Sequence, residues 1–271
     1  MTIEKVTYNP DSIRIQLATN EEQIHAAQML RYSVFYDEYG AKPSPQMASE
    51  KRDFDEYDSI TDHLIVLDLD KPEGQQQVIG TYRLLRHDVA MKHGKFYTSS
   101  EYNISPLLNN EGNLLELGRS CVLAPYRTRP ILQKLWEGIA HYVAEHNIDL
   151  MFGCASFHGT DIKELSLPLS YLYHYHLAPA EKCPRALDSL HVEMNIHAKE
   201  SFDAKKAFMT LPPLIKGYLR LGAFIGDGAV IDEQFNTTDV CIVMPTEKIA
   251  KKYMRHYERK TQRPISNTSI S

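Results

Sequence analysis

Residues 114–133, LLELGRSCVLAPYRTRPILQ, organise the predicted fold. They begin with an apolar run to position 122, interrupted by Glu116 and Arg119, which is typical of a β-strand. A loop with Arg127 and Arg129 follows, and from Ile131 to position 146 apolar residues recur at helical spacing. The stretch therefore predicts a strand, a basic loop and a helix in succession.

Glu116 and Arg119 are the charged side chains of this predicted strand. Because side chains alternate between the faces of a strand, Glu116 and Gly118 should point one way and Arg119 the other, unless a bulge re-aims them. A carboxylate is costly to bury without a partner. The residues alone leave two interpretations open. One is a solvated charge pair on an edge strand, and the other is a general base in a sheet cleft beside a helix N-terminus, whose free amides can hold an acyl donor's phosphate or carbonyl.

Length and composition are those of an ordinary globular protein. With 271 residues, 43% of them hydrophobic, the chain has enough material for one large domain or two small ones. The formal net charge of -5 argues against a general nucleic-acid binder. The start, MTIEKVTYNP, lacks a signal peptide's apolar segment, and no apolar run reaches the roughly 18 residues that span a bilayer, so we expect a cytoplasmic protein. The four cysteines are widely spaced without a CxxC pair, which favours reduced thiols over disulfides or a zinc site: Cys121, Cys154, Cys183 and Cys241.

The rest of the chain mixes predicted strands and helices. Strands are predicted at residues 12–17, 63–68, 78–86, 150–156, 190–196 and 238–244, with the second and third forming a hairpin. Helices are predicted at residues 20–38, 161–175, 203–221 with a break at two prolines, and 246–260. Residues 41–62 and the segment after residue 86 are predicted as loops, and a Gly-rich turn precedes the last strand. This order predicts an α/β (α+β) fold with a mixed, mostly antiparallel sheet, in a single domain at residues 1–260 with a flexible tail at 261–271.

Seven residues then stand in a suggestive order across about 90 positions. They are an Arg and a Phe on the first long helix, a D-x-x-D pair, an Arg on a strand, and an E-x-G-R motif: Arg31, Phe35, Asp55, Asp58, Arg83, Glu116 and Arg119. This order resembles that of the acyl-homoserine lactone synthases, which carry Arg, Phe, paired Asp, Arg and E-x-S-R on a GNAT-type fold.

The chain is more similar to a related family, the ornithine N-acyltransferases, which make lyso-ornithine lipid from a 3-hydroxyacyl chain on acyl carrier protein. The similar segments run from about residue 20 to 245: RYSVFYDEYGA, DFDEYDSITDHLIV, IGTYRLLR, LELGRSCV, FGCASFHGTD and LPPLIKGYLRLGAFIGDGAVIDEQFNTTDVCIV. The resemblance implies a GNAT-like sheet whose splayed central strands form the acyl-donor cleft. It also implies transfer of a (3-hydroxy)acyl chain from acyl carrier protein to the α-amine of L-ornithine.

The donor side departs from the coenzyme A-using GNAT enzymes, which carry a Gly-rich loop around the pyrophosphate. Here the loop reads YRTRPI, without glycine, and Pro130 removes one amide donor. This favours the phosphopantetheine thioester of acyl carrier protein as co-substrate, with no other cofactor, and Arg127 and Arg129 supplying charge. We expect the acyl donor and its oxyanion to lie against the strand end formed by Cys121, Val122 and Leu123.

On the acceptor side, an α-amine with a pKa of about 8 is only about a tenth neutral at pH 7, so a base is needed. Glu116 is the predicted base and Arg119 its catalytic companion. Arg119, Arg83 or Arg31 would hold the ornithine carboxylate, Phe35 would line the site, and Asp55 or Asp58 would hold the side-chain ammonium. Two alternatives stay open: Arg31 with Asp55 or Asp58 is a structural ion pair, and His158 is a loop hydrogen-bonder rather than a second acid or base. No metal site is predicted, since neighbouring positions such as His174 and His176 do not converge on one ion.

The predicted binding partners are inferred from one basic, apolar segment, which contains Lys205, Lys206, Lys216 and Arg220. It suits docking of the acidic carrier protein or contact with an anionic membrane, and an ordinary solvated helix face is the plain alternative. Peripheral attachment to the inner face of the cell membrane is accordingly an alternative to a purely cytoplasmic place. Other functions also stay open: acyl transfer to another amino acid such as glycine or lysine, an acyl-homoserine lactone synthase-like enzyme, a coenzyme A-dependent acetyltransferase, or a non-catalytic carrier-protein or membrane-surface binder.

Overall fold

The computed structural model describes residues 8–109 and 112–247. Nine strands of these residues form a single sheet in the order β1-β2-β3-β5-β6-β9-β8-β7-β4. Their bounds are β1 Ile13–Leu17, β2 Asp62–Asp68, β3 Val78–Arg86, β4 Tyr102–Asn103, β5 Asn113–Val122, β6 Ile148–His158, β7 Arg185–Ala186, β8 Phe224–Asp232 and β9 Thr237–Pro245. Neighbouring strands are antiparallel except for β5 with β6 and β7 with β8. The predicted mixed, mostly antiparallel sheet is therefore confirmed.

Helices pack on both faces of this sheet. They are α1 Glu21–Tyr32, continued by a π-helix at Ser33–Glu38, α2 Pro45–Glu50, α3 His87–His93, α4 Ser105–Leu108, α5 Arg129–Glu145, α6 Ile162–His176, α7 Ala204–Thr210 and α8 Pro213–Arg220. In β2, Leu64 and Val66 belong to the same apolar cluster as the buried side of α5, whereas Ile65 and Leu67 cluster with α1. Because neighbouring side chains of a strand point to opposite faces, α1 and α5 cover opposite faces of the first half of the sheet.

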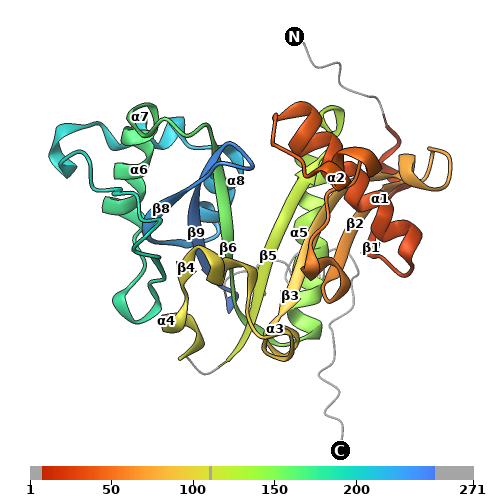
Figure 1. The fold of residues 1–271 in the computed structure, drawn as a ribbon, viewed down its shortest axis with the longest axis horizontal. Coiled ribbons are helices and arrows are strands. Elements are labelled where there is room, and N and C mark those ends of the chain that lie inside the picture. Colours follow the sequence, from red (N-terminus) through yellow and green to blue (C-terminus); the bar gives the residue numbers. More distant parts are fainter. Residues whose placement is uncertain (1–7, 110–111, 248–271) are drawn as a thin grey trace, which may run out of the picture.

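The two central strands, β5 and β6, separate part-way along their length (Figure 1). Their parallel pairing runs from Asn113 with Ile148 to Glu116 with Phe152 and then stops. At the point of separation Gly153 has φ +152°, and a Cβ there would lie 2.1 Å from the carbonyl oxygen of Leu117. Only glycine allows this close approach of two backbones. Beyond it β5 continues with β3 and β6 with β9, so the sheet opens into a wedge.

Several predicted elements are confirmed in detail. Asn20 caps α1 by accepting a hydrogen bond from the backbone N–H of Gln23, and Asp161 caps α6 in the same way through Lys163. The β2–β3 pair is antiparallel, and the segment after Asp203 is broken between α7 and α8 at the paired prolines.

Three predictions from the sequence are wrong. The Gly-rich segment before the last strand is not a turn but β8, with a register shift between Ile225 and Ala229 where Gly228 has φ +82°, so its glycines mark a bulge. Residues 190–196 do not form a strand, since only Val192 pairs, with Ala229. Ser170 Oγ instead accepts from the backbone N–H groups of residues 196 and 197. The segments predicted as loops contain α2, α3, α4 and the short strand β4.

The predicted closing helix at residues 246–260 lies outside the described residues apart from its first two positions, and the tail at 261–271 lies outside them entirely. The domain boundary at residue 260 therefore stays a prediction. Across residues 8–109 and 112–247, none of the helices has both the length and the apolar character that crossing a bilayer requires.

Candidate active site

A cavity of about 490 Å³ occupies the wedge between β5 and β6. Its walls come from both separated strands, from Leu117 to Val122 on one side and from Cys154 to His158 on the other. The start of α8, the π-helix after α1 and the end of β8 supply further lining residues. The cavity thus forms where β5 and β6 lose their pairing. Because β5 lies between β3 and β6, it is an interior strand and not the edge strand considered as an alternative.

Arg119 lies at a β-bulge in β5. Its φ is +50°, and the pairing with β3 shifts between Thr81 with Cys121 and Arg83 with Gly118. Two residues of β5, Arg119 and Ser120, therefore lie opposite a single residue of β3, which breaks the simple alternation of faces. Simple alternation would place Glu116 and Arg119 on opposite faces of β5. Because the bulge breaks the alternation, both side chains line the cavity.

Glu116 is 4% exposed and lines the cavity at the vertex of the wedge. Its Oε2 accepts from the backbone N–H of Tyr97 at 2.9 Å and its Oε1 from that of Thr98 at 2.6 Å. Burial raises the pKa of this carboxyl, and the hydrogen bonds from Thr98 and Tyr97 only partly oppose the shift. Oε2 accepts from the Tyr97 amide and keeps a further lone pair, so the carboxylate can still accept a proton from a ligand.

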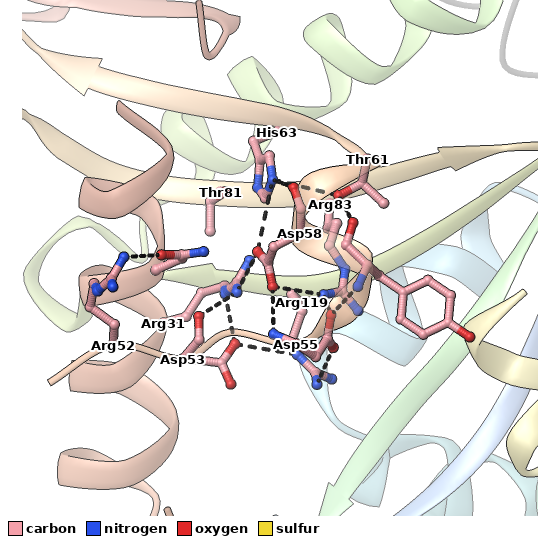
Figure 2. A network of polar contacts seen from close by, with 12 residues as sticks. Arg31, Arg52, Asp53, Asp55, Asp58, Thr61, His63, Thr81, Arg83 and Arg119 are labelled. Atoms are coloured by element: carbon pink, nitrogen blue, oxygen red, sulfur yellow. Dashed lines mark hydrogen bonds and ion pairs between the residues drawn. The ribbon is translucent and has the colours of Figure 1, made fainter. Parts of the chain in front are cut away.

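Three arginines and three aspartates form a buried network beside the cavity (Figure 2). Arg31, fully buried, pairs through Nε with Asp53 and through Nη2 with Asp58, both at 2.7 Å. Arg83 Nη1 lies 2.6 Å from Asp55 and 3.2 Å from Asp58. Burial by itself would raise the pKa of Asp53, but the charges of Arg31 and Arg119 outweigh it and hold that pKa below its usual value. The opposite charges are equal in number, so the network is internally neutralised.

Arg119 connects this network to the cavity. Its Nη2 lies 3.1 Å from Asp55 and its Nε 3.3 Å from Asp53. The guanidinium lies 4.9 Å from the ring centroids of both Tyr97 and Phe235. Held between two aromatic rings, it has a fixed position at the cavity wall.

The predicted site residues divide between the cavity and its support. Those that line the cavity are Phe35, Arg83, Glu116, Arg119, Cys121, Val122 and Arg127. Arg31, Asp55 and Asp58 instead belong to the charge network and not to the wall, so the structural ion-pair interpretation describes Arg31. Of the aspartates that Arg31 contacts, the sequence pattern had not singled out Asp53.

On the donor side, the end of β5 presents its backbone to the wedge. The N–H of Leu123 donates to Ile79 on β3, and because successive amides point to opposite edges, the N–H of Val122 points to the open side. Burial raises the pKa of Cys121 to about 12, so this thiol stays protonated and acts as packing. Arg127 forms a double hydrogen bond with Glu38 and lies over the ring of Tyr39, whereas Arg129 is exposed at the start of α5 outside the wall.

Comparisons with known proteins agree with this geometry. Residues 30–137 match the family model for an acetyltransferase (GNAT) domain. L-ornithine N(alpha)-acyltransferase of Brucella abortus is 46% identical over 255 residues, which cover 93% of this chain and 91% of that protein. The protein of the same name from Rhizobium meliloti is 45% identical and covers 91% of this chain and 84% of its own length. The chain belongs to the L-ornithine N(alpha)-acyltransferase family.

Solved structures are less similar to this acyltransferase. A coenzyme A-dependent acyl-homoserine lactone synthase, solved with SAM and isopentyl-CoA, is 12% identical, with a TM-score of 0.49 over 90% of this chain and 88% of that one. The family model and the curated relatives confirm the GNAT-like fold expected from the sequence.

Sequence reasoning missed an acidic cluster in the acyltransferase. The carboxyl oxygens of Glu101, Asp232 and Asp239 lie within 4.8 Å of one another, and Asp232 and Asp239 line the cavity. Burial, followed by the charge of Asp239, raises the pKa of Glu101 to about 7, and burial with the charge of Asp232 raises that of Asp239 to about 6. Glu101 is distant in sequence from the β8–β9 pair, which supplies Asp232 and Asp239. The one local signal was an aspartate within the apolar run of β9, because charged residues are seldom buried without a partner.

Proposed function

We propose that this family member transfers a long acyl chain, 3-hydroxylated in the natural substrate, from acyl carrier protein to the α-amine of L-ornithine, giving lyso-ornithine lipid. Membership of the family supports ornithine as the acceptor. The observation that carries the mechanism is the position of Glu116, a buried carboxylate with a raised pKa in the wall of a cavity between two diverging strands.

Glu116 is the proposed base. The ornithine α-amine enters the cavity as an ammonium and loses one proton to Glu116 before attack, and a carboxylate with a raised pKa is the better proton acceptor. The amine nitrogen then attacks the thioester carbon, the new C–N bond forms, and the C–S bond breaks. The proton held by Glu116 passes to the leaving thiolate, and the nitrogen, which is positively charged after attack, loses its second proton to solvent as the amide forms, so the carboxylate returns to its starting state.

The end of β5 is the proposed place for the thioester carbonyl. The tetrahedral intermediate carries a negative oxygen that needs a preorganised donor, and the N–H of Val122 points away from β3, toward the wedge. The cavity wall near it is apolar and suits an acyl chain, and it includes Val34, Phe35, Leu117, Leu132, Trp136 and Leu214. No nucleophilic serine or cysteine is required, in agreement with the raised pKa of Cys121.

Acyl carrier protein is the proposed donor because the loop before α5 lacks the glycines that wrap a coenzyme A pyrophosphate, and Pro130 in the first turn of α5 has no N–H. The phosphopantetheine arm carries one phosphodiester and needs fewer donors. Helix α8 lines the cavity, and the α7–α8 pair carries the exposed Lys205, Lys206 and Arg220, which would attract an acidic carrier protein.

The test is a reaction of purified protein with 3-hydroxyacyl and unsubstituted acyl thioesters of acyl carrier protein and of coenzyme A, each offered ornithine, lysine and glycine. We expect acyl-ornithine from the carrier-protein thioester. Product with glycine or lysine alone would refute the acceptor, and equal use of coenzyme A would refute the donor. Exchanging Lys205 and Lys206 for Glu should raise KM for the carrier-protein thioester. Sedimentation with anionic vesicles tests whether the same helices also contact a membrane.

A further inference from the structure

The acidic cluster is assembled on one face of the second half of the sheet. Asp232 pairs with Thr237 across β8 and β9, and Ser156 pairs with Asp239 across β6 and β9. Residues directly opposite each other share a face, and Asp232, Thr237, Asp239 and Ser156 all line the cavity. Glu101 reaches the same place from the end of the short helix at Tyr97–Ser100.

The cluster lacks a cation among the described residues. Asp232 Oδ1 accepts from two backbone amides, those of residues 234 and 235, and Glu101 Oε2 accepts from the Cys154 thiol at 3.1 Å. Asp239, 7% exposed, has an oxygen, Oδ1, that is buried without a well-aligned hydrogen-bond partner, and the neighbouring Ser156 and Thr237 hydroxyls only partly oppose the rise in its pKa. The charge of Arg119 lowers the pKa of Glu101 and of Asp239 only slightly, because its guanidinium is paired with other aspartates, Asp53 and Asp55.

A buried carboxylate oxygen without a hydrogen-bond partner, beside two other carboxylates, costs free energy unless a proton or a cationic ligand joins it. A cationic ligand would reach the cluster through the cavity, since Asp232 and Asp239 form part of the cavity wall. The same cavity holds Glu116, and the short helix at Tyr97–Ser100 connects the two places. Its first amides bind Glu116, and Glu101 follows its last residue.

We infer that Glu101, Asp232 and Asp239 form the subsite for the side-chain ammonium of the acceptor amino acid. The inference rests on the proposed function and assigns the acceptor's specificity to these three residues, in place of Asp55 and Asp58, which arginines already neutralise. A primary ammonium has three N–H donors, one for each carboxylate. A divalent cation is the competing occupant, but it prefers six or more oxygen ligands, and the cluster offers three carboxylates, one of which already accepts two backbone hydrogen bonds.

The test compares ornithine with norvaline, which has the same carbon chain without the terminal amine. Asp239→Asn and Glu101→Gln should each lower kcat/KM for ornithine by about 10²-fold or more, mainly through KM, because the cationic ligand loses a buried charge partner. The kcat/KM for norvaline should change less than threefold, so the preference for ornithine collapses. Glu233→Gln is the matched control, since Glu233 is an exposed neighbour of Asp232 outside the cavity wall and its loss should leave both values unchanged.

Calorimetry separates this inference from the proposed reaction. Ornithine should bind the wild-type protein without acyl donor, and Asp239→Asn should abolish the heat of binding while the thermal melt shows a folded protein. Retained ornithine binding and preference in both variants would overturn the subsite, even if acyl transfer to ornithine is observed. Tight binding of Ca²⁺, Mg²⁺ or Mn²⁺ that Asp239→Asn removes, with ornithine binding lost on chelation, would overturn it in favour of a metal. Absence of transfer to any acceptor, with ornithine binding intact and sensitive to Asp239, would refute the reaction and keep the subsite.

Discussion

Replacing Glu116 by Gln is the sharpest test of the mechanism, because it removes the base and keeps its shape. The glutamine oxygen can still accept from one of the two backbone amides at residues 97 and 98, while its NH₂ group faces the other. One unpaired amide costs about 1–3 kcal/mol, and loss of a buried charge offsets part of that cost. Alanine would leave both amides without a partner, at about 2–6 kcal/mol, and is the poorer test.

We expect Glu116→Gln to stay folded and to lose about 10²- to 10⁴-fold in kcat, which corresponds to about 3–5 kcal/mol in the activation barrier. The assay is release of the carrier-protein thiol with saturating ornithine, measured between pH 6 and 9. Because the α-amine has a pKa of about 8, the neutral fraction rises from about a tenth at pH 7 to most of the population at pH 9. The variant should therefore recover up to about tenfold of its lost rate over that interval.

Two results would refute this reasoning. A variant that keeps near wild-type turnover would show that Glu116 is only the cap of the helix at Tyr97–Ser100. A loss of turnover that does not lessen at high pH, together with a melting temperature far below that of the wild type, would show that the change acts through the fold.

Other perturbations give further expected outcomes. Gly153→Ala places a Cβ 2.1 Å from the Leu117 carbonyl oxygen and should lower the free energy of unfolding by at least about 1–3 kcal/mol in urea titrations, whereas an unchanged midpoint would contradict the close contact. Arg31→Met leaves buried carboxylates without one of their partners and should cost about 3–5 kcal/mol by the same measurement, so a loss below 1 kcal/mol would show that the network tolerates the gap. Cys121→Ser should retain most activity, and its inactivation would show that the thiol takes part in transfer. Because the pKa of Glu101 is raised from 4.5 to about 7, the folded state holds a proton that the unfolded chain releases, so stability should fall as pH rises from about 4.5 to 7; Glu101→Gln should flatten that slope, and an equal slope in both proteins would assign it to other groups.

The central strand, loop and helix were predictable because their signals are local. A strand or helix that buries only one face shows alternating or helical apolar spacing, and this spacing predicts its type. The caps at Asn20 and Asp161 then predict where α1 and α6 begin. The prediction of a turn at the Gly-rich segment was wrong because its signal is ambiguous. Glycines at a bulge and glycines in a turn look the same in sequence, and only the closeness of Pro184 to Gly226 and the positive φ of Gly228 separate them.

The candidate site was predictable in part. The motif around Glu116 and Arg119 led to the cavity, because both residues lie on one short segment of β5. The partner of Arg31 could not be chosen from sequence, since three aspartates lie within six positions and only the fold selects Asp53 and Asp58. The acidic cluster was out of reach because Glu101 lies more than 100 residues before Asp232 and Asp239, which meet each other through the pairing of β8 with β9.

The separation of β5 and β6 also bears on aggregation. Strand edges with free N–H and C=O groups normally invite pairing with a second protein molecule. Beyond Leu117 and Gly153, this protein has two such edges in the middle of its sheet, and they face each other across the cavity. Side chains of the π-helix after α1 and of α8 also line this space, so the two edges lie inside the acyltransferase and not at the ends of the sheet, where a second protein molecule would pair.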